Sequence, residues 1–148
     1  TIPTGMESQH LFAFEDLLPT AAELAGVPKE LWPETDGVSI APLLTGKGIQ
    51  QQHSHLYWEY CDYSERGGGS MKQSYAHGWV QALRVDRSGT EWKALRSNRG
   101  SLQLFNLTAD PSESMNIAAS HPHIAAEFVH LMEDSRFETS YWPSTSSK

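Results

Sequence analysis

Three closely spaced apolar segments in the second half of the chain do most to limit the folds open to it. They are "GWVQALRV" at 78–85, "EWKALRSN" at 91–98 and "SLQLFNL" at 101–107. The linkers between them, "DRSG" and "NRG", have the residues of hairpin turns. With the aromatic segment "LYWEY" at 56–60, they predict a small antiparallel sheet of about four strands.

A helix is expected after the last strand. Ser120 is suited to cap it, and Pro122 falls in its first turn, where a missing N–H costs little. Five apolar residues then follow helical spacing and form one face: Ile124, Ala125, Phe128, Leu131 and Met132. That face would cover one side of the sheet, so the expected fold class is α+β: an antiparallel sheet covered by a C-terminal helix.

The first 50 residues have a different character. Residues 10–15, "HLFAFE", alternate weakly and predict a short strand, after which Asp16 is suited to an N-cap. The apolar run 17–25 predicts a helix that ends at Gly26. A second short helix is expected through "SIAPLLTG", ending at Gly46. The first helix is apolar on most sides, so it requires burial by a neighbour.

Composition excludes several classes of protein. A chain of 148 residues has the length of one ordinary domain, and its net charge of -7 argues against nucleic acid and anionic membranes as main partners. There is no apolar run of transmembrane length and no visible signal peptide. The chain does not start with Met, so we expect it to begin inside a longer protein. A single cysteine excludes an internal disulfide framework.

Few residues indicate chemistry by themselves. Cys61 lacks the basic partner that a catalytic cysteine needs, so a structural or incidental thiol is favoured. His53 and His55 would share one face of a strand, but a zinc site needs three or four ligands, and we expect solvated loop histidines. The same holds for His121 and His123, which flank Pro122.

A glycine-rich run and a set of cationic side chains are two further features that could bind an anion. The run "ERGGGSMK" at 65–72 could cradle an anion through backbone N–H groups, but a surface loop is favoured because the context of a P-loop is missing. Arg84, Lys93 and Arg96 could meet a polyanionic substrate, although the solvated face of an antiparallel sheet is the favoured interpretation.

The tryptophans are distributed one per strand. Trp58, Trp79 and Trp92 are expected in the core, and sugar stacking is the alternative for one of them. No paired carboxylates, metal set or nucleophile with a base emerges from the residues.

The order of several segments resembles that of the sulfatase family, the sulfuric ester hydrolases. The similar segments are "HLFAFEDLLPTAAELAGV" at 10–27, "DGVSIAPLLTG" at 36–46, "LYWEY", "QALRVDRSGTEWKALRSN" at 81–98 and "LQLFNLTADPSESMNIAASHP" at 102–122. The last of these resembles the closing strand, turn and helix lead-in of the family. Asp110 and Pro111 would set the turn, and Asn116 would cap local backbone.

The resemblance also implies what these residues lack. Sulfatases use a formylglycine made from a Cys or Ser in a "CxPxR" or "SxPxR" motif, and they bind calcium through Asp and Asn residues, all in a larger N-terminal domain. Cys61 does not fit that motif, because Tyr63 stands two positions on and Arg66 is one place too far. No catalytic or metal residue of the family is therefore expected in this chain, which alone should be inactive.

The resemblance implies that different parts of this chain have different structural roles in a parent enzyme. Residues 1–50 would pack on the missing catalytic domain, 51–143 would form the sheet and helix, and 144–148 would be a disordered tail. The loop 61–78 is our candidate for one wall of the substrate cleft, and the candidate cleft residues are His77, Trp58, Arg66 and Arg84.

The partners implied are the N-terminal catalytic domain and a sulfated small molecule or glycan, and the isolated chain is expected to self-associate. The resemblance further implies an exported parent. The alternatives are a free-standing binding or assembly module, and the tail of a related phosphonate or phosphate ester hydrolase.

Overall fold

The computed structural model describes residues 2–61, 79–98 and 100–137. The chain divides into two compact units, Thr1–Leu56 and Tyr57–Lys148. The helical elements of the first unit are η1 (Phe14–Asp16), α1 (Leu17–Leu24), η2 (Lys29–Leu31) and α2 (Ala41–Thr45), where η denotes a 3-10 helix. Those of the second unit are η3 (Ala118–Ser120) and α4 (Pro122–Asp134).

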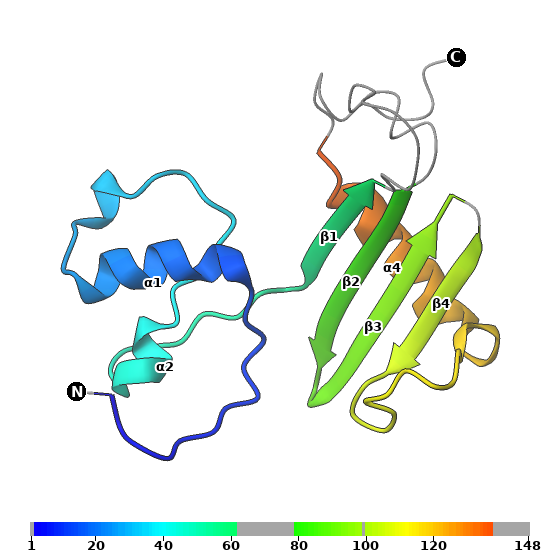
Figure 1. The fold of residues 1–148 in the computed structure, drawn as a ribbon, viewed down its shortest axis with the longest axis horizontal. Helices are drawn as coiled ribbons and strands as arrows, with labels where there is room; N and C mark the ends of the chain where they lie inside the picture. The colour runs from blue at the N-terminus through cyan, green and yellow to red at the C-terminus, as the bar shows by residue number, and fades with distance from the viewer. Residues whose placement is uncertain (1, 62–78, 99, 138–148) are drawn as a thin grey trace, which may run out of the picture. The chain divides into compact units, whose positions relative to one another are not determined.

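The predicted sheet is confirmed. Its four strands lie in the order β1 (Leu56–Cys61), β2 (Trp79–Arg87), β3 (Thr90–Ser97) and β4 (Gly100–Asn106). β2 pairs antiparallel with β3, and β3 pairs antiparallel with β4. Helix α4 runs along one face of this sheet (Figure 1). The α+β class and the covering C-terminal helix are therefore as expected.

The hairpin between β2 and β3 shows why its linker is a good turn. Arg87 pairs with Thr90, which leaves Ser88 and Gly89 as the two turn residues. Their φ angles are 52° and 81°, and two successive positive φ angles are typical of a type I′ turn. The Asp86 carboxylate accepts the N–H of Gly89 at 3.0 Å, which further stabilises the turn.

The core of the second unit lies between the sheet and α4. Strand alternation sends Leu83, Trp92 and Leu104 to the same face, because residues in register on paired strands share a side. Phe128 and Met132, one turn apart on α4, pack on that face with no exposed surface. The predicted apolar face of this helix is thus confirmed, with Ile124 and Leu131 at its margin.

The predicted cap of α4 was wrong. His121, not Ser120, precedes the helix, and its side chain makes no capping hydrogen bond. Ser120 ends the 3-10 turn η3, and its hydroxyl donates to the carbonyl of Ile117 at 2.9 Å. Pro122 is the first residue of α4 as predicted, because the position needs no N–H donor.

The segment between β4 and η3 is held by two side chains that the sequence analysis identified. Asn116 Oδ1 accepts the N–H groups of Leu104 and Ala118, each at 3.0 Å. The Asp110 carboxylate accepts the N–H of Met115 at 2.9 Å and the hydroxyl of Ser114 at 3.0 Å. Asn116 therefore caps backbone as predicted, and it ties the outer edge of β4 to the lead-in of α4.

Helix α1 ends as its glycine predicts. Gly26 has φ 71°, and the N–H groups of Gly26 and Val27 donate to the carbonyls of Glu23 and Ala22, each at 3.0 Å. This is a Schellman motif, in which a residue in the left-handed region reverses the chain and satisfies the last carbonyls. Gly46 ends α2 with a similar conformation, φ 66°.

The strand predicted at residues 10–15 was wrong. The segment contains no strand and runs into η1, which closes with the N–H of Asp16 donating to the carbonyl of Ala13 at 3.2 Å. Asp16 also does not cap α1, because its own backbone is helical and its carboxylate makes no capping bond. Instead, that carboxylate reaches back to the N–H of Ala13 at 2.8 Å, which favours the turn over an extended chain.

Candidate functional site

Two predicted cleft residues lie on the sheet face that α4 does not cover. Arg84 alternates with Leu83 and Val85 of the core, so it points to the opposite face, where Lys93 of β3 is its direct cross-strand partner. Trp58 alternates with Tyr57, which packs against the core, and its side of β1 is therefore also the uncovered one. This set of Trp58, Arg84 and Lys93 is the candidate site.

The two cations of the candidate site are half-buried and paired. Arg84 Nη2 donates to Glu91, and Lys93 Nζ donates to Glu113 at 2.7 and 2.8 Å. These side chains are 39% and 24% exposed on the face that α4 does not cover, so the favoured interpretation of a solvated sheet face holds for them in part. Each cation also has an acidic partner, which offsets the repulsion between like charges on facing strands. Arg84 Nε is buried and lacks a hydrogen-bond partner among the described residues.

Arg96 does not belong to this set. It faces Gln81 across the β2–β3 ladder and therefore lies on the core side of the sheet. Its Nε donates to Gln81 Oε1 at 2.9 Å, and its guanidinium lies 5.6 Å from the centre of the Trp79 ring. The sequence carried this signal: Lys93 and Arg96 are three positions apart, an odd spacing that places them on opposite faces of a strand.

The tryptophans are only partly in the core. Trp92 is buried in the main cluster, and the edge of its ring contacts His121. Trp58 is 39% exposed, so the prediction that it fills the core was wrong. An exposed indole on the same sheet face as an arginine and a lysine can contact an apolar or sugar-like group, while the cations interact with an anion.

A buried polar network closes the end of the core near Tyr57. Gln81 Nε2 donates to the hydroxyl of Tyr57 at 2.9 Å, and that hydroxyl donates to Glu59. Burial, followed by the hydrogen bond to Glu59, raises the pKa of Tyr57 well above its usual value. Arg136 Nε donates to Glu59 at 3.3 Å. Because every member has a partner, the network fixes the sheet against the end of α4.

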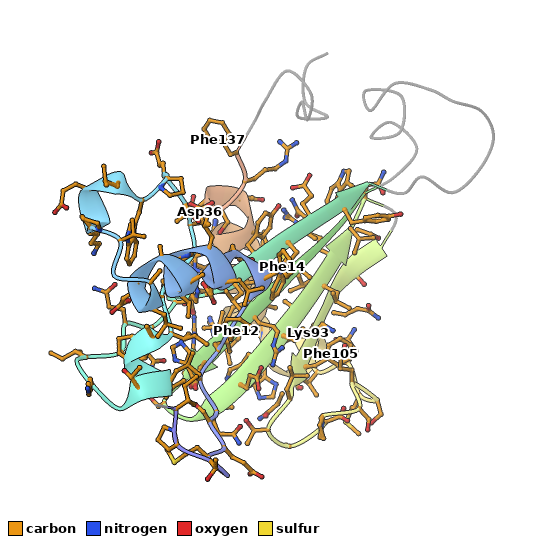
Figure 2. The ribbon with its side chains drawn as sticks, turned by 60° about the vertical axis from the view of Figure 1, so that its left-hand side comes forward. Phe12, Phe14, Asp36, Lys93, Phe105 and Phe137 are labelled. Carbon is orange, nitrogen blue, oxygen red and sulfur yellow. The ribbon has the colours of Figure 1, made fainter. Side chains whose placement is uncertain are left out.

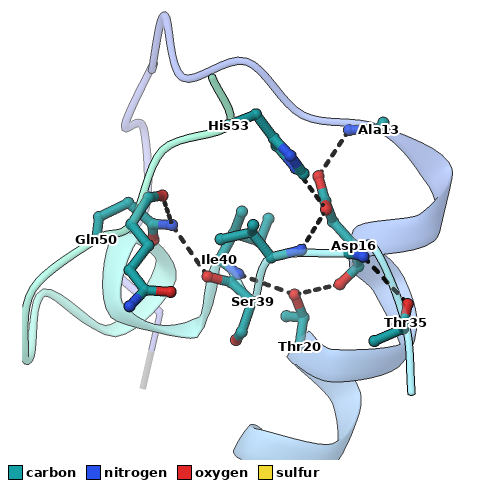
Figure 3. A network of polar contacts seen from close by, with 11 residues as sticks. Ala13, Asp16, Thr20, Thr35, Ser39, Ile40, Gln50 and His53 are labelled. Atoms are coloured by element: carbon teal, nitrogen blue, oxygen red, sulfur yellow. Dashed lines mark hydrogen bonds and ion pairs between the residues drawn. The ribbon is translucent and has the colours of Figure 1, made fainter. Parts of the chain in front are cut away.

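The first unit contains a second polar network, which the sequence analysis missed (Figure 3). The Asp16 side chain has no exposed surface, and its Oδ1 lies 2.8 Å from His53 Nε2. The same oxygen accepts the N–H of Val38 at 2.7 Å. His53 is 9% exposed, so the prediction of a solvated loop histidine was wrong. Its partner lies 37 residues away, and no local pattern could have revealed it.

Thr20 and Gln50 extend this network within the first unit. The Thr20 hydroxyl donates to the carbonyl of Asp16 at 2.6 Å and accepts the N–H of Ile40 at 2.9 Å. Gln50 accepts the N–H of Leu43 at 3.1 Å and donates to the carbonyl of Ser39 at 2.9 Å. These contacts hold the residues before α2 against α1, and they hold Gln50 against α2 and the residue pair that precedes it (Figure 3).

The first unit also has an open cavity of about 660 Å³ beside η2. Its lining is mixed, with Val27, Trp32 and Pro42 next to Glu23 and Lys29. The Trp32 indole N–H already donates to the carbonyl of Val27 at 2.9 Å.

Among residues 2–61, 79–98 and 100–137, no group of three His, Cys, Asp or Glu side chains could hold a metal ion. No helix in these ranges is long and apolar enough to cross a membrane. His77, Arg66, most of the predicted loop 61–78, the run 65–72 and the tail 144–148 lie outside the described residues.

Comparison with known proteins gives a consistent set of relatives. Arylsulfatase K of Danio rerio is 29% identical over 134 residues, which is 88% of this chain. Choline-sulfatase of Rhizobium meliloti is 35% identical over 70% of the chain, and arylsulfatase A of Bos taurus is 31% identical over 80%. No family model matches. The chain spans 17% to 24% of the length of these relatives.

Two solved structures share the fold. A phosphonate monoester hydrolase of Agrobacterium radiobacter matches 88% of this chain and 26% of its own, with TM-score 0.64 and 19% identity. A protein solved in complex with its substrate D-glucosamine-2-N,6-O-disulfate matches 81% of this chain and 23% of its own, with TM-score 0.54 and 21% identity. The fold of this chain thus occurs as one part of these two longer chains.

Proposed function

Because this chain is homologous to sulfatases over most of its length and has the fold of their C-terminal subdomain, we propose that it is the C-terminal part of an enzyme that hydrolyses sulfate esters. The observation that carries the proposal is the similarity to three curated sulfatases over 70% to 88% of the chain. The proposed substrate is an aryl sulfate or a sulfated sugar.

The reacting groups of this proposal lie outside the chain. The described residues contain no group of three His, Cys, Asp or Glu side chains that could hold a metal ion, and Cys61 does not fit the formylglycine motif. Under this proposal, the calcium ion and formylglycine that the resemblance implies belong to another part of the parent polypeptide, and the chain alone should not turn over substrate. The resemblance also supports a parent that is exported from the cytoplasm, which cell fractionation would test.

The proposed contribution of this chain is to binding. The Arg84 side chain is 39% exposed on the uncovered sheet face, so its guanidinium could interact with an anionic substrate in addition to Glu91. Trp58, on the same face, offers an exposed ring to the remainder of the substrate. His77 and Arg66 remain proposed members of the same wall.

Apolar residues of the first unit support a catalytic domain as its partner. Leu17, Leu18 and Leu24 of α1 are 47%, 54% and 50% exposed. A helix with this much exposed leucine is typical of a surface that another domain covers. The isolated chain is expected to associate with itself through it, and sedimentation velocity over a wide concentration range would show this. A monomer throughout that range would contradict this partner assignment.

The activity is tested on the full polypeptide that contains this chain. We expect it to release sulfate from 4-nitrophenyl sulfate or from a sulfated glucosamine, whereas residues 1–148 alone release none. Cleavage of phenyl phosphonate without sulfate release would favour the second candidate, a phosphonate ester hydrolase, which the fold similarity supports. Absence of both activities in a folded full-length protein would favour a non-catalytic binding module.

The binding role is tested by Arg84→Gln in the same full-length protein. The expected result is a higher KM with little change in kcat, because a contact made equally in the ground state and the transition state affects binding alone. Arg87→Gln is the matched control, since Arg87 lies on the side of α4 and pairs with Glu127. Equal changes in KM for the two variants would contradict the proposal that Arg84 lines the substrate cleft.

A further inference from the structure

One buried carboxylate joins three segments of the first unit. Asp16 Oδ2 accepts the N–H of Ala13, and Asp16 Oδ1 accepts the N–H of Val38 and contacts His53 Nε2. The N-terminal segment, the segment after η2 and the segment before β1 therefore meet at a side chain with no exposed surface. A carboxylate so enclosed depends on all of its donors, because water cannot replace any of them.

Two further histidines lie around this pair. Both ring nitrogens of His10 are buried and have no hydrogen-bond partner among the described residues. His55 Nδ1 is 3.0 Å from the Ser54 hydroxyl. The titratable groups that face one another here are thus His10 from the N-terminal segment, Asp16 from η1, and His53 and His55 from the segment before β1.

The surroundings of His10 and His55 disfavour a positive charge on either ring. Burial lowers the pKa of His10, the neighbouring His53 lowers it further, and Asp16 opposes the shift. Burial and then His53 also lower the pKa of His55. Both imidazoles therefore take up a proton less readily than a free histidine does, and hydration of either ring or its movement away from His53 would favour protonation.

The same histidines border the small apolar cluster of the first unit. Leu11, Ala13 and Leu56 form this cluster and are 9%, 6% and 2% exposed. Leu11 follows His10 directly, and Leu56 follows His55. An imidazolium that turns toward solvent at either position pulls on a residue of the cluster, and Ala13 is the residue that donates to Asp16.

We propose that His10 and His55, beside the contact between Asp16 and His53, form a proton-sensitive lock, which holds residues 10–56 together at neutral pH and loosens them on acidification. The lock does not depend on the proposed function, since it rests on contacts within the first unit. The direction follows from linkage: His10 and His55 bind protons more weakly when folded than when unfolded. The stability that these two histidines contribute is fully present when the pH is above 6.5, the ordinary pKa of histidine. It is lost as the pH falls below that value.

Amide hydrogen exchange of the full polypeptide tests the lock. Exchange is measured at about pH 7.5 and about pH 5, the range over which histidines change charge, with labelling times corrected for the intrinsic pH dependence. Peptides covering residues 10–24 and 36–56 are expected to lose protection at the lower pH. Peptides from β2 and β3 are the internal reference and should keep it. Equal protection of the first unit at both pH values would overturn the proposal.

Variants identify the groups responsible. The double variant His10→Gln, His55→Gln cannot take up the two protons, so its first unit should keep at pH 5 the protection that it has at pH 7.5. His130→Gln is the matched control, because His130 lies on α4 with a side chain 77% exposed, and it should behave as the parent does. If the double variant still loses protection on acidification, the lock is not formed by these histidines. The single variants His10→Gln and His55→Gln each retain one of the two imidazoles, so each should lose an intermediate amount of exchange protection at pH 5.

Discussion

Asp16 and His53 are 37 residues apart in the sequence, yet Asp16 Oδ1 and His53 Nε2 lie 2.8 Å from each other. This contact decides how the first unit is held together, because the same carboxylate accepts the N–H groups of Ala13 and Val38. The apolar cluster of Leu11, Ala13 and Leu56 in this unit is small, so these polar contacts carry much of its specificity.

Asp16→Asn is therefore expected to destabilise the first unit. The change keeps the shape but replaces a charged acceptor of several hydrogen bonds with a neutral amide, at a cost of about 1.5 to 3 kcal/mol. Urea unfolding followed by circular dichroism, together with amide exchange of residues 13–40, measures the loss. Asp36→Asn is the control, since Asp36 is exposed, and it should change stability by less than about 0.5 kcal/mol. Equal effects would show that Asp16 is not the centre of the network.

Gly37→Ala should be more damaging than an ordinary glycine substitution. A Cβ at this position would lie 2.2 Å from the carbonyl oxygen of Glu15 and 2.7 Å from its carbon, both backbone atoms. The chain must move there, and the move displaces Val38 from Asp16, so we expect a loss of about 2 kcal/mol or more. Gly100→Ala is the control, because its nearest contact is the Ser97 hydroxyl at 3.4 Å. Thermal unfolding measures the loss of stability in both variants. A larger loss for Gly100→Ala than for Gly37→Ala would refute the close approach of Gly37 to the backbone of Glu15.

Phe128→Ala tests the core of the second unit. The ring is fully buried under the sheet, and its removal leaves a cavity that costs about 3 to 5 kcal/mol. Phe137→Ala removes a ring of the same size that is 82% exposed and projects outward (Figure 2), and it should be close to neutral. Urea midpoints of the two variants supply the comparison, and a small effect of Phe128→Ala would mean that α4 is not anchored by this residue.

Substitutions of Asn116 can separate the contribution of its hydrogen-bond acceptor from that of its side-chain volume. Asn116→Ala leaves the N–H groups of Leu104 and Ala118 without their acceptor, and we expect a loss of about 1 to 3 kcal/mol. Asn116→Asp retains an acceptor oxygen and should recover most of that loss near neutral pH. Denaturation curves of both variants decide the matter: similar losses for the two would show that hydrogen-bond acceptance is not what the residue contributes.

The carboxyl group of Asp110 should make the stability of the turn after β4 depend on pH. Hydrogen bonds from the backbone N–H groups of Met115 and Ser114 hold the pKa of this carboxyl below its ordinary value of 3.8. A lowered carboxyl pKa gives stability that is present above the ordinary value and is lost as the pH falls through the folded one. The N–H of Met115 should therefore lose exchange protection only below that ordinary value. In Asp110→Asn the protection should be lower but independent of pH, and a persistent pH dependence would point to another group.

Much of the second unit follows from local patterns. The strands are marked by alternation and by the Ser88–Gly89 turn, and α4 is marked by the spacing of Phe128 and Met132. These patterns work because the period of a strand or a helix decides which side chains share a face, and the apolar face must be buried. The placement of Arg96 opposite to Arg84 and Lys93 follows from the same rule once the register is known.

The sheet, its covering helix and the resemblance to sulfatases can all be recognised in the amino-acid sequence. Which polar groups meet becomes visible only in the folded chain. Residues 10–15 alternate weakly, but the Asp16 carboxylate draws the chain into a turn, and His53 is buried by a partner that no spacing rule connects to it. Apolar periodicity is a local property of the chain. A contact between a carboxylate and an imidazole 37 residues away depends instead on the path of everything between them.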